Sequence, residues 1–390
     1  MLVLRIGIFT TKFPYKGPFG SDIPTGDQPL WGGVEEATYQ LALALNELGH
    51  EIKIFTTSLT GGDEVQEYEN ITVYRYKKLF KVQHTPISFG LLKEPLKHDV
   101  DVVHIQRGSP SGVIAGYIYS KIKKKPFVVT YHNDPVTGGE SLMRENLVNM
   151  FGKFQRRILM DADIITTLSL NLFKKSKFLR DICYKVKIVP NGVNSGDFNS
   201  IGTKYRHKNT ILFVGSLTEW KAPHVLLKSL GEVVKKFPDL RAIFVGDGIL
   251  KEKLRTLSLE LGLQDCVIFK GFIINEEEKI KYYKSAEILV MPSYSEGFPI
   301  TLLEASAFGL LLIVSDIEEF KAFIEENHNG VFFRVGDSLD LANKITKVLE
   351  DERLKRKFGY VAKEKVRRFN WKNIAKIFCR IYNDIQGSDM

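Results

Sequence analysis

The 390-residue sequence is poor in cysteine and has no long apolar run. Its three cysteines, Cys183, Cys266 and Cys379, are far apart and lack metal-ligand spacing, so the chain encodes neither a disulfide framework nor a zinc site. The first apolar segment ends before Lys12 and Pro14 and is too short for a signal peptide, and no segment reaches the roughly 18 apolar residues of a membrane-spanning helix. We therefore expect a cytoplasmic protein.

The composition also lacks the bias of disordered or nucleic-acid-binding chains. With 44% hydrophobic and 26% charged residues it is typical of a soluble globular protein. The basic runs at 123–125 and 174–177 have no interleaved aromatic residues and belong to no recognition-helix motif, so we expect no nucleic-acid partner. A chain of this length favours two domains, each with its own core.

The net charge of +9 is concentrated in the first half, where residues 1–195 carry 25 Lys and Arg against 19 Asp and Glu. This excess fits an anionic acceptor or an anionic lipid surface, but a solvated lysine-rich face is the commoner cause. The segment LVNMFGKFQRRIL aligns Leu147, Phe151, Phe154 and Ile158 on one helical face beside basic residues. This apolar face could contact the inner face of a membrane peripherally. Packing of the face in the protein core is the commoner outcome.

Short apolar segments alternate with helix-period segments, which predicts an α/β fold with parallel sheets. LRIGIF, HEIKIFTT, DVVHI, PFVVTYH, DIITTL and KVKIV are the expected strands of a first domain, residues 1–195. After a polar linker the pattern restarts with TILFVG, LRAIFVG, CVIFKG, EILVMPS, LLLIVSD and GVFFRV, in a second domain at 196–370. The segment 371–390 is a helix with Ile374, Phe378 and Ile381 on one face, which needs a partner surface.

Two features of the first half lie where open α/β sheets bind ligands. The Gly- and Pro-rich connection after the first strand ends on Gly32 and Gly33, where a helix begins and its free N–H groups can meet phosphate. Glu35 and Glu36 can satisfy the same groups, so a plain helix cap is an equal interpretation. His132 follows the strand PFVVTY at its carboxyl end and can donate to a substrate hydroxyl or phosphate, or be structural.

The second half contains a candidate cation and a candidate carboxylate pair. Lys221 precedes a helix whose start is marked by Pro223, and this outlines an anion site, although most lysines are simply solvated. Glu296 precedes the helix ITLLEASA and Glu304 lies in its second turn, about 10 Å away if the residues between are mostly helical. The first turn has no acidic side chain, so its N–H groups remain for a phosphate.

That carboxylate spacing suits two ends of one extended ligand. A hydrolase is the competing chemical interpretation, because paired carboxylates also cleave glycosidic bonds. The other alternative is a surface Glu296 with a coincidental Glu304, yet a glutamate on so apolar a helix needs a partner.

Two DxD triplets resemble metal–diphosphate motifs but precede strands that should be buried. They are Asp99–Asp101 and Asp161–Asp163, and we interpret both as turn and cap acids. No other cluster has metal-ligand spacing, so we expect no metal and no cofactor.

Taken together, these segments resemble the retaining glycosyltransferases of the GT-B fold, in glycosyltransferase family 4. The resemblance spans nearly the whole chain, through WGGVEEATYQLALALNELGHEIKIFT, VVTYHND, VPNGVNSGDF, FVGSLTEWKA and, most specifically, EGFPITLLEASAFG with its Glu-x7-Glu spacing. It implies two Rossmann-like domains facing each other across a cleft, with the last helix crossing back to the first domain. The implied partner is a nucleotide diphosphate sugar, and the acceptor stays unidentified.

The resemblance also implies roles for the candidate residues. Glu304 would bind the donor ribose, Glu296 the hydroxyls of the donor sugar, and His132 the transferred sugar. Lys221 would neutralise the diphosphate and, with a helix N-terminus, stabilise the leaving group while the departing phosphate oxygen takes the acceptor proton on the same face of the sugar. The turn at Gly32 and Gly33 would approach the diphosphate from the first domain, and Gly271 and Phe272 would edge the base pocket. Backbone N–H groups in the segment Gly297, Phe298, Pro299 and Ile300 would meet the diphosphate, except at proline, which has none.

The chain departs from the family pattern in three places. Ser216 replaces the usual arginine after FVG, SDIEEFKAFI replaces a common Gly-Gly segment, and GLLLIV lacks the usual proline. We expect transfer of a hexose, with UDP favoured as the nucleotide. The alternatives are a sugar-nucleotide epimerase, a phosphorylase on the same fold, or an inactive donor-binding subunit, for which Ser216 is the sequence hint.

Overall fold

The computed structural model describes residues 3–20, 32–82, 85–132, 142–194 and 206–387, the stretch 142–150 as backbone only. The chain divides into two compact units. The first unit comprises residues 1–191 together with 371–390, and the second unit comprises residues 192–370. The domain boundary expected at 195/196 falls outside the described residues and stays a prediction.

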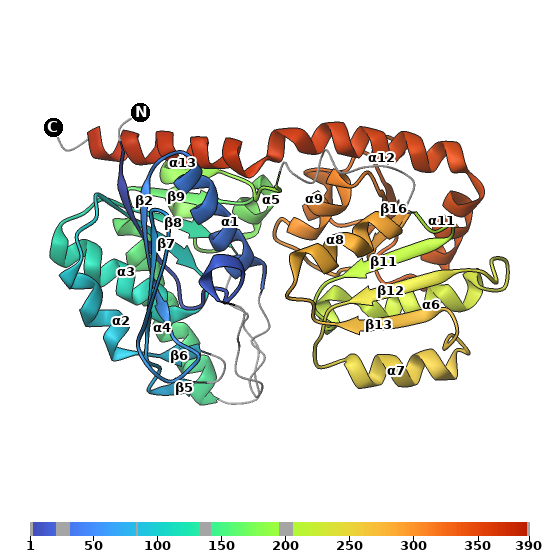
Figure 1. Ribbon diagram of the computed structural model, residues 1–390, viewed down its shortest axis with the longest axis horizontal. Helices are drawn as coiled ribbons and strands as arrows, with labels where there is room; N and C mark the ends of the chain where they lie inside the picture. The colour runs from blue at the N-terminus through green and yellow to red at the C-terminus, as the bar shows by residue number, and fades with distance from the viewer. Residues whose placement is uncertain (1–2, 21–31, 83–84, 133–141, 195–205, 388–390) are drawn as a thin grey trace. The chain divides into compact units, whose positions relative to one another are not determined.

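The first unit is built on a mostly parallel sheet in the order β10-β9-β8-β7-β1-β2-β4-β3 (Figure 1). Every strand expected from the apolar segments of the first half is present. The sheet as a whole consists of β1 (Arg5–Phe9), β2 (Glu51–Thr57), β3 (Glu64–Tyr68), β4 (Ile71–Tyr76), β7 (Val102–Arg107), β8 (Phe127–Tyr131), β9 (Ile164–Thr167) and β10 (Val186–Ile188).

Two hairpins of the first unit have no counterpart among the expected strands. β3 runs antiparallel to β4 at the sheet edge, and the turn between them holds Glu69 at a positive φ of 51°. β5 (Phe80–Val82) and β6 (Thr85–Ile87) form a second antiparallel pair. β3 is polar and exposed and gives only a weak alternation signal, whereas β4 is buried at Ile71 and Val73. The alternating segment ITVYRY of β4 was therefore an available signal that was missed.

The helices of the first unit include the C-terminal one. They are α1 (Gly33–Glu47), α2 (Phe89–Lys93), α3 (Pro110–Lys123), α4 (Leu142–Asp161), α5 (Leu170–Lys175) and α13 (Trp371–Gln386). α13 packs against α1, and its apolar face of Ile374, Phe378 and Ile381 is buried there (Figure 1). The first unit therefore supplies the partner surface that the last helix requires.

The second unit is a fully parallel sheet in the order β13-β12-β11-β14-β15-β16. This is the strand order of a doubly wound Rossmann sheet. All six strands match expected segments: β11 (Thr210–Val214), β12 (Arg241–Val245), β13 (Val267–Gly271), β14 (Ile288–Met291), β15 (Leu311–Ser315) and β16 (Val331–Phe333). Both faces of the central strands are buried, as Ile211 and Leu212 of β11 show. This explains their continuous apolar sequence.

The helices of the second unit connect these strands. They are α6 (Pro223–Val233), α7 (Lys251–Glu260), α8 (Glu276–Ser285), α9 (Ile300–Ala307), α10 (Glu318–Lys321), α11 (Ser338–Glu350) and α12 (Glu352–Val366). The main core cluster joins alternate side chains of the strands, such as Ile211 and Phe213, to α6 and α11. Two Rossmann-like units, each with its own core, are therefore confirmed.

Each sheet has a point where the chain reverses its direction of winding. In the second unit it lies between β11 and β14, and in the first unit between β1 and β7. Open α/β sheets bind ligands outside the carboxyl ends of the strands at such points. The loops after these four strands are therefore the places to look for a site.

Candidate active site

The loops after β11 and β14 bring Lys221 and Glu296 into contact. The Lys221 Nζ donates to both carboxylate oxygens of Glu296, at 2.6 and 2.7 Å. Ser293 donates a further hydrogen bond to Oε1 of Glu296, at 2.7 Å. The Glu296 side chain is only 6% exposed, whereas that of Lys221 is 22% exposed. Two residues 75 positions apart in the chain thus form one charged centre at the switch point of the sheet.

Backbone contacts hold these two loops together. The Tyr294 N–H donates to the Trp220 carbonyl at 2.8 Å, one residue before Lys221. Behind them, the loop after β12 approaches so closely that a Cβ on Gly246 would lie 1.9 Å from the Gly215 carbonyl oxygen. Gly246 also has a φ of +141°, so a glycine is required there. The position of the loop that carries Ser216 and leads to Lys221 is therefore set by backbone packing.

Glu304 lies in α9 and is held by two side chains of α8. The Lys279 Nζ donates to its Oε1 at 2.7 Å, and the Tyr283 hydroxyl donates to its Oε2 at 2.6 Å. Burial, and then the Glu304 charge, raise the pKa of Tyr283, so its hydroxyl stays protonated and donates. Tyr283 also stacks on Phe308, with ring centroids 5.5 Å apart. Glu304 is therefore an ordered carboxylate with a defined orientation.

Three partners of the two glutamates were not expected from the sequence: Lys279, Tyr283 and Ser293. Lys279 and Tyr283 are four residues apart on a helix and share a face, and this spacing was an available signal. Ser293 lies three residues before Glu296 in the loop after β14, where only the tertiary structure shows its direction.

The start of α9 is open to an anion. Pro299 is its N-cap and supplies no capping side chain, and the first turn, beginning at Ile300, holds no acidic residue. Gly297 and Phe298 lead into it, and the Phe298 ring stacks on Phe369 with centroids 5.7 Å apart. A helix N-terminus without an acidic cap favours a negatively charged ligand.

The remaining predicted donor residues of the second unit lie in neighbouring loops. Gly271 ends β13 with a φ of +74°, and its carbonyl accepts from the Gly246 N–H at 2.8 Å. Phe272 follows and is half-buried. The Ser216 hydroxyl pairs with that of Thr218 at 3.2 Å. These residues gather at the same carboxyl edge as Lys221, and their roles stay predictions.

In the first unit, the turn at Gly32 and Gly33 opens α1. Its Gly32 N–H donates to Oε2 of Glu35 at 2.9 Å, and Glu36 pairs with Lys16 at 2.6 Å. In this structure the Gly32 N–H thus serves the helix cap, the alternative weighed from the sequence. Gly32 and Gly33 are both exposed.

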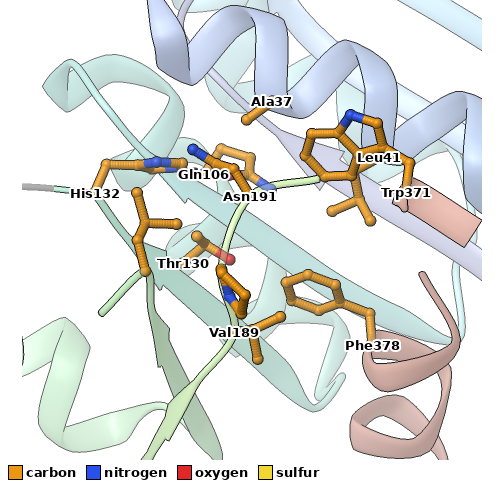
Figure 2. A pocket seen from close by; sticks show the side chains of 11 residues that line it. Ala37, Leu41, Gln106, Thr130, His132, Val189, Asn191, Trp371 and Phe378 are labelled. Atoms are coloured by element: carbon orange, nitrogen blue, oxygen red, sulfur yellow. Dashed lines mark hydrogen bonds between the residues drawn. The ribbon is translucent and has the colours of Figure 1, made fainter. Parts of the chain in front are cut away.

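His132 follows β8 and is buried to 5% exposure (Figure 2). Its Nε2 lies 2.8 Å from the amide oxygen of Gln106, at the end of β7. Burial, and then the Arg107 charge, lower its pKa to about 3, so the imidazole is neutral. A cavity of about 10 Å³, about the room of one water molecule, adjoins it and is lined also by Thr130, Asn191 and Trp371.

The two DxD triplets are occupied by protein contacts. Asp101 accepts from the backbone and guanidinium of Arg5, and Asp163 accepts from the Phe127 N–H. Asp99 and Asp161 pair with lysines. Within the described residues, no group of three or more His, Cys, Asp or Glu side chains is arranged to hold a metal ion.

The helical face considered for membrane contact is split in α4. Ile158 is 1% exposed and belongs to the core, while Phe154 is 37% exposed and packs its ring against Tyr117. The side chain of Leu147 lies outside the described residues. Over the described part of the chain, no helix is both long and apolar enough to span a bilayer.

Two models of known protein families match this chain. The family model for glycosyl transferases group 1 matches residues 197–365, and the model for glycosyltransferase family 4 matches residues 31–196. The chain is a family 4 glycosyltransferase. The two matches meet at 196/197, close to the division between the two units at 191/192, and together they cover residues 31–365 of this glycosyltransferase.

Two curated relatives of this glycosyltransferase are mannosyltransferases. The O-antigen chain mannosyltransferase C of Escherichia coli is 28% identical over 340 residues, 84% of this chain and 88% of that protein. The phosphatidyl-myo-inositol mannosyltransferase of Mycolicibacterium smegmatis is 25% identical over 389 residues, covering 95% and 93% of the two chains.

Among solved structures, Anabaena HepE in complex with UDP-glucose superimposes with a TM-score of 0.73 at 17% identity. The superposition covers 98% of this chain and all of that chain. The sucrose-phosphate synthase of Thermosynechococcus elongatus gives a TM-score of 0.72 at 20% identity, over 98% and 99% of the two chains. The GT-B fold of this glycosyltransferase is therefore confirmed.

Proposed function

We propose that this glycosyltransferase transfers a hexose from a nucleotide diphosphate sugar with retention of the anomeric configuration, and that UDP is its favoured nucleotide. Two observations on similar proteins support this choice. The curated relatives are named as mannosyltransferases, and HepE is described in complex with UDP and with UDP-glucose. Mannose and glucose are both hexoses.

The observation that carries the proposal is the Lys221–Glu296 pair at the switch point, beside an ordered Glu304. A lysine ammonium has three donor hydrogens, and Glu296 accepts from it through both oxygens. The third hydrogen can meet a phosphate oxygen, so the lysine can hold the diphosphate without releasing the carboxylate. Glu296 then binds sugar hydroxyls next to the phosphate that leaves, and Glu304 binds the ribose.

The chemistry balances without a protein nucleophile. The bond from the anomeric carbon to the phosphate oxygen breaks, and the acceptor oxygen forms a new bond to that carbon on the same face. The departing phosphate oxygen takes the acceptor proton. Lys221 and the N-terminus of α9 stabilise the charge that develops on the leaving diphosphate.

The acceptor that we propose is anionic or lipid-linked. The support is the +6 excess of residues 1–195 and the name of a relative, a phosphatidyl-myo-inositol mannosyltransferase. Cosedimentation with vesicles of phosphatidylcholine and phosphatidylglycerol at low salt tests for contact with an anionic lipid surface, with phosphatidylcholine vesicles as the control. Equal partition to both vesicle types would contradict an electrostatic contact.

The donor is tested by thermal shift with UDP-, GDP- and ADP-hexoses, followed by a transfer assay. A ligand at a hundred times its dissociation constant stabilises the fold by about 2.7 kcal/mol. We expect one UDP-hexose to stabilise the protein and to be consumed with release of UDP when an acceptor is present. An α-linked product from an α-linked donor shows retention. Stabilisation without turnover would favour an inactive donor-binding subunit. Conversion of the donor sugar without transfer to an acceptor would favour an epimerase.

A further inference from the structure

The amide of Gln106 lies between two buried histidines. Its oxygen is 2.8 Å from Nε2 of His132, and its nitrogen is 3.2 Å from Nε2 of His104. Gln106 is 2% exposed and His104 is fully buried. Gln106 and His132 line the cavity of Figure 2 together.

A side-chain amide has one donor end and one acceptor end, and this constrains the two imidazoles. The acceptor end needs a protonated Nε2 on His132. The donor end needs an unprotonated Nε2 on His104, whose proton must then be on Nδ1. There the Tyr382 hydroxyl lies 2.7 Å away and accepts it. A single glutamine thus sets the two histidines in opposite tautomers.

Because His132 uses its Nε2–H on Gln106, its other ring nitrogen is an acceptor. Among the described residues, none is hydrogen-bonded to Nδ1 of His132, whose hydrogen bond joins Nε2 to Gln106. Its position after β8, at the carboxyl edge of the sheet, is where this fold binds ligands. From the sequence we expected His132 to donate to the ligand. In this geometry the ring nitrogen left for a ligand, Nδ1, is an acceptor.

We propose that Gln106 is a positioning residue that holds His132 as the Nε2–H tautomer, so that Nδ1 accepts a hydrogen bond from a hydroxyl of the transferred hexose. The identity of that hydroxyl-bearing ligand rests on the proposed function. The tautomer itself rests only on the contacts of Gln106. The class of ligand group is a hydroxyl, because a phosphate oxygen without a proton cannot donate to Nδ1.

The C-terminal helix takes part in this arrangement through Tyr382 of α13. Tyr382 is fully buried, and its hydroxyl ends the chain of polar groups that begins at His132. Nε2 of His104 is also 2.6 Å from the Thr130 hydroxyl, which in this tautomer donates to it and accepts from the Thr166 hydroxyl at 2.7 Å. A buried polar network that loses one member leaves its neighbours unsatisfied, so Tyr382 constrains His104 and, through Gln106, His132.

Burial keeps both rings neutral, which a fixed tautomer requires. It lowers the pKa of His104 to about 3, with a further contribution from His132. The pKa of His132 is lowered to about 3 by burial and the charge of Arg107. At pH 7 neither ring carries the second proton that would turn Nδ1 of His132 into a donor.

The tautomers are measured directly on the free full-length protein labelled with ¹⁵N-histidine. The sequence has eight histidines, and the variants His104→Asn and His132→Asn assign the two that matter. Two-bond ¹H–¹⁵N correlation spectra at pH 7 should show Nε2–H on His132 and Nδ1–H on His104. The reverse pattern, an imidazolium or a mixed tautomer on His132 overturns the proposal, whatever the activity.

The kinetic arm uses Gln106→Met, which keeps the volume and removes the amide. We expect His132 to become a mixture of tautomers and kcat to fall about tenfold, as for loss of one hydrogen bond. The UDP dissociation constant should stay within about twofold, because UDP is held by the second unit. Gln40→Met is the matched control, since Gln40 is also a buried glutamine, 7% exposed, and its amide donates to Glu36 at 2.8 Å.

Tyr382→Phe tests the contribution of α13. It should shift the His104 tautomer first and disturb that of His132 through Gln106, with a smaller fall in kcat. An unchanged kcat in Gln106→Met, with its tautomers mixed, overturns the role in transfer. A wild-type protein that shows the expected tautomers but transfers no sugar refutes the proposed function instead, so the two failures are distinguishable.

Discussion

Lys221 and Glu296 share one ion pair, with the ammonium 2.6 and 2.7 Å from the two carboxylate oxygens. The resemblance to family 4 implied that the lysine binds the diphosphate and the glutamate the sugar, as two separate contacts. The pairing means that each residue also sets the position and the charge of the other. A variant at either residue therefore changes both halves of the donor site.

Lys221→Ala should nearly abolish transfer and also lower the free energy of unfolding. Among the described residues, it leaves the 6%-exposed Glu296 carboxylate with Ser293 as its remaining donor, at a cost of about 2 kcal/mol. Adding Glu296→Gln should recover most of that stability without recovering transfer. Urea unfolding measures the first effect and UDP release the second.

Lys235→Ala is the matched control for that experiment. Its pair with Glu232 is exposed, at 68% and 54%, and should contribute well under about 1 kcal/mol. Intact donor affinity and turnover in Lys221→Ala would show that the anion site lies elsewhere.

Glu304→Ala should mainly weaken nucleotide binding, whereas Glu296→Ala should mainly lower turnover, because the two carboxylates hold opposite ends of the donor. Loss of a charged hydrogen bond costs roughly 1.5 to 3 kcal/mol. Tyr283→Phe removes one donor to Glu304 and should weaken UDP binding by a smaller factor, measured by calorimetry.

Tyr282→Phe provides the comparison for Tyr283→Phe on the same helix. The Tyr282 hydroxyl meets the exposed Glu278 at 3.4 Å and does not contact Glu304. Small and equal effects of Glu296→Ala and Glu304→Ala would contradict the assignment of the two carboxylates.

Ser216→Arg should tighten binding of the nucleoside diphosphate product several-fold. Ser216 is half-buried at the donor edge, and its hydroxyl is bonded only weakly, to Thr218 at 3.2 Å. An arginine there would add a charge-assisted contact to phosphate. Because the site is partly exposed, that contact should improve the binding free energy by only about 1 kcal/mol. Titration of UDP against both proteins measures the change, and weaker binding by the variant would show that position 216 does not face the phosphates.

Stability should fall as the pH drops below 6.5, in part because of His104 and His132. Their folded-state pKa values are depressed to about 3, so between pH 6.5 and 3 the unfolded chain binds protons that the folded chain does not. Each histidine then contributes about 1.4 kcal/mol of lost stability per pH unit, and none above pH 7. Urea unfolding at pH 7.5, 6.5 and 5.5 follows this change.

His132→Gln should remove one histidine's share of that slope. The rate of transfer by the wild type should show no titration of His132 between pH 5 and 8, because the imidazole is neutral throughout. A kcat that rises with an apparent pKa near 6.5, and that loses this dependence in His132→Gln, would contradict a neutral ring.

Transfer should persist in excess EDTA. The carboxylates of both DxD triplets are engaged with Arg5, lysines and a backbone N–H, which leaves the diphosphate to Lys221 and the start of α9. The assay compares rates with EDTA, with EDTA followed by excess Mn²⁺, and without addition. Complete loss of transfer in EDTA, with recovery on adding Mn²⁺, would show that a metal ion takes part in donor binding.

The strands were predictable because their signal is local. Segments such as TILFVG and EILVMPS are apolar on both faces, since a parallel strand under two layers of helices needs both faces buried. The edge strand β3 was not predictable, because a polar, exposed strand needs no apolar face. Its neighbour β4 is buried at Ile71 and Val73, so its alternating segment ITVYRY was a signal that was missed. The expected place of the sites followed from the same reasoning, because strand ends in sequence become the carboxyl edge of a sheet.

The candidate donor residues could be named from the sequence, but their partners could not. Lys279 and Tyr283 are 25 and 21 positions from Glu304, and they contact it only because the tertiary fold brings α8 to α9. His132 was chosen for its place after a strand. The direction of its hydrogen bonds depends on Gln106 and His104, which are ordinary residues of a buried strand in the sequence.

The sequence by itself determined the α/β alternation, the two domains, the family and the residues at the strand ends, because these depend on local periodicity and on motifs. Only the tertiary structure decided that Lys221 and Glu296 form one charged centre, and that Tyr382 of α13 reaches His104 in the first unit. Both contacts join residues far apart in the chain, 75 positions in one case and 278 in the other. Their geometry comes from strand order and helix packing, which no local pattern encodes.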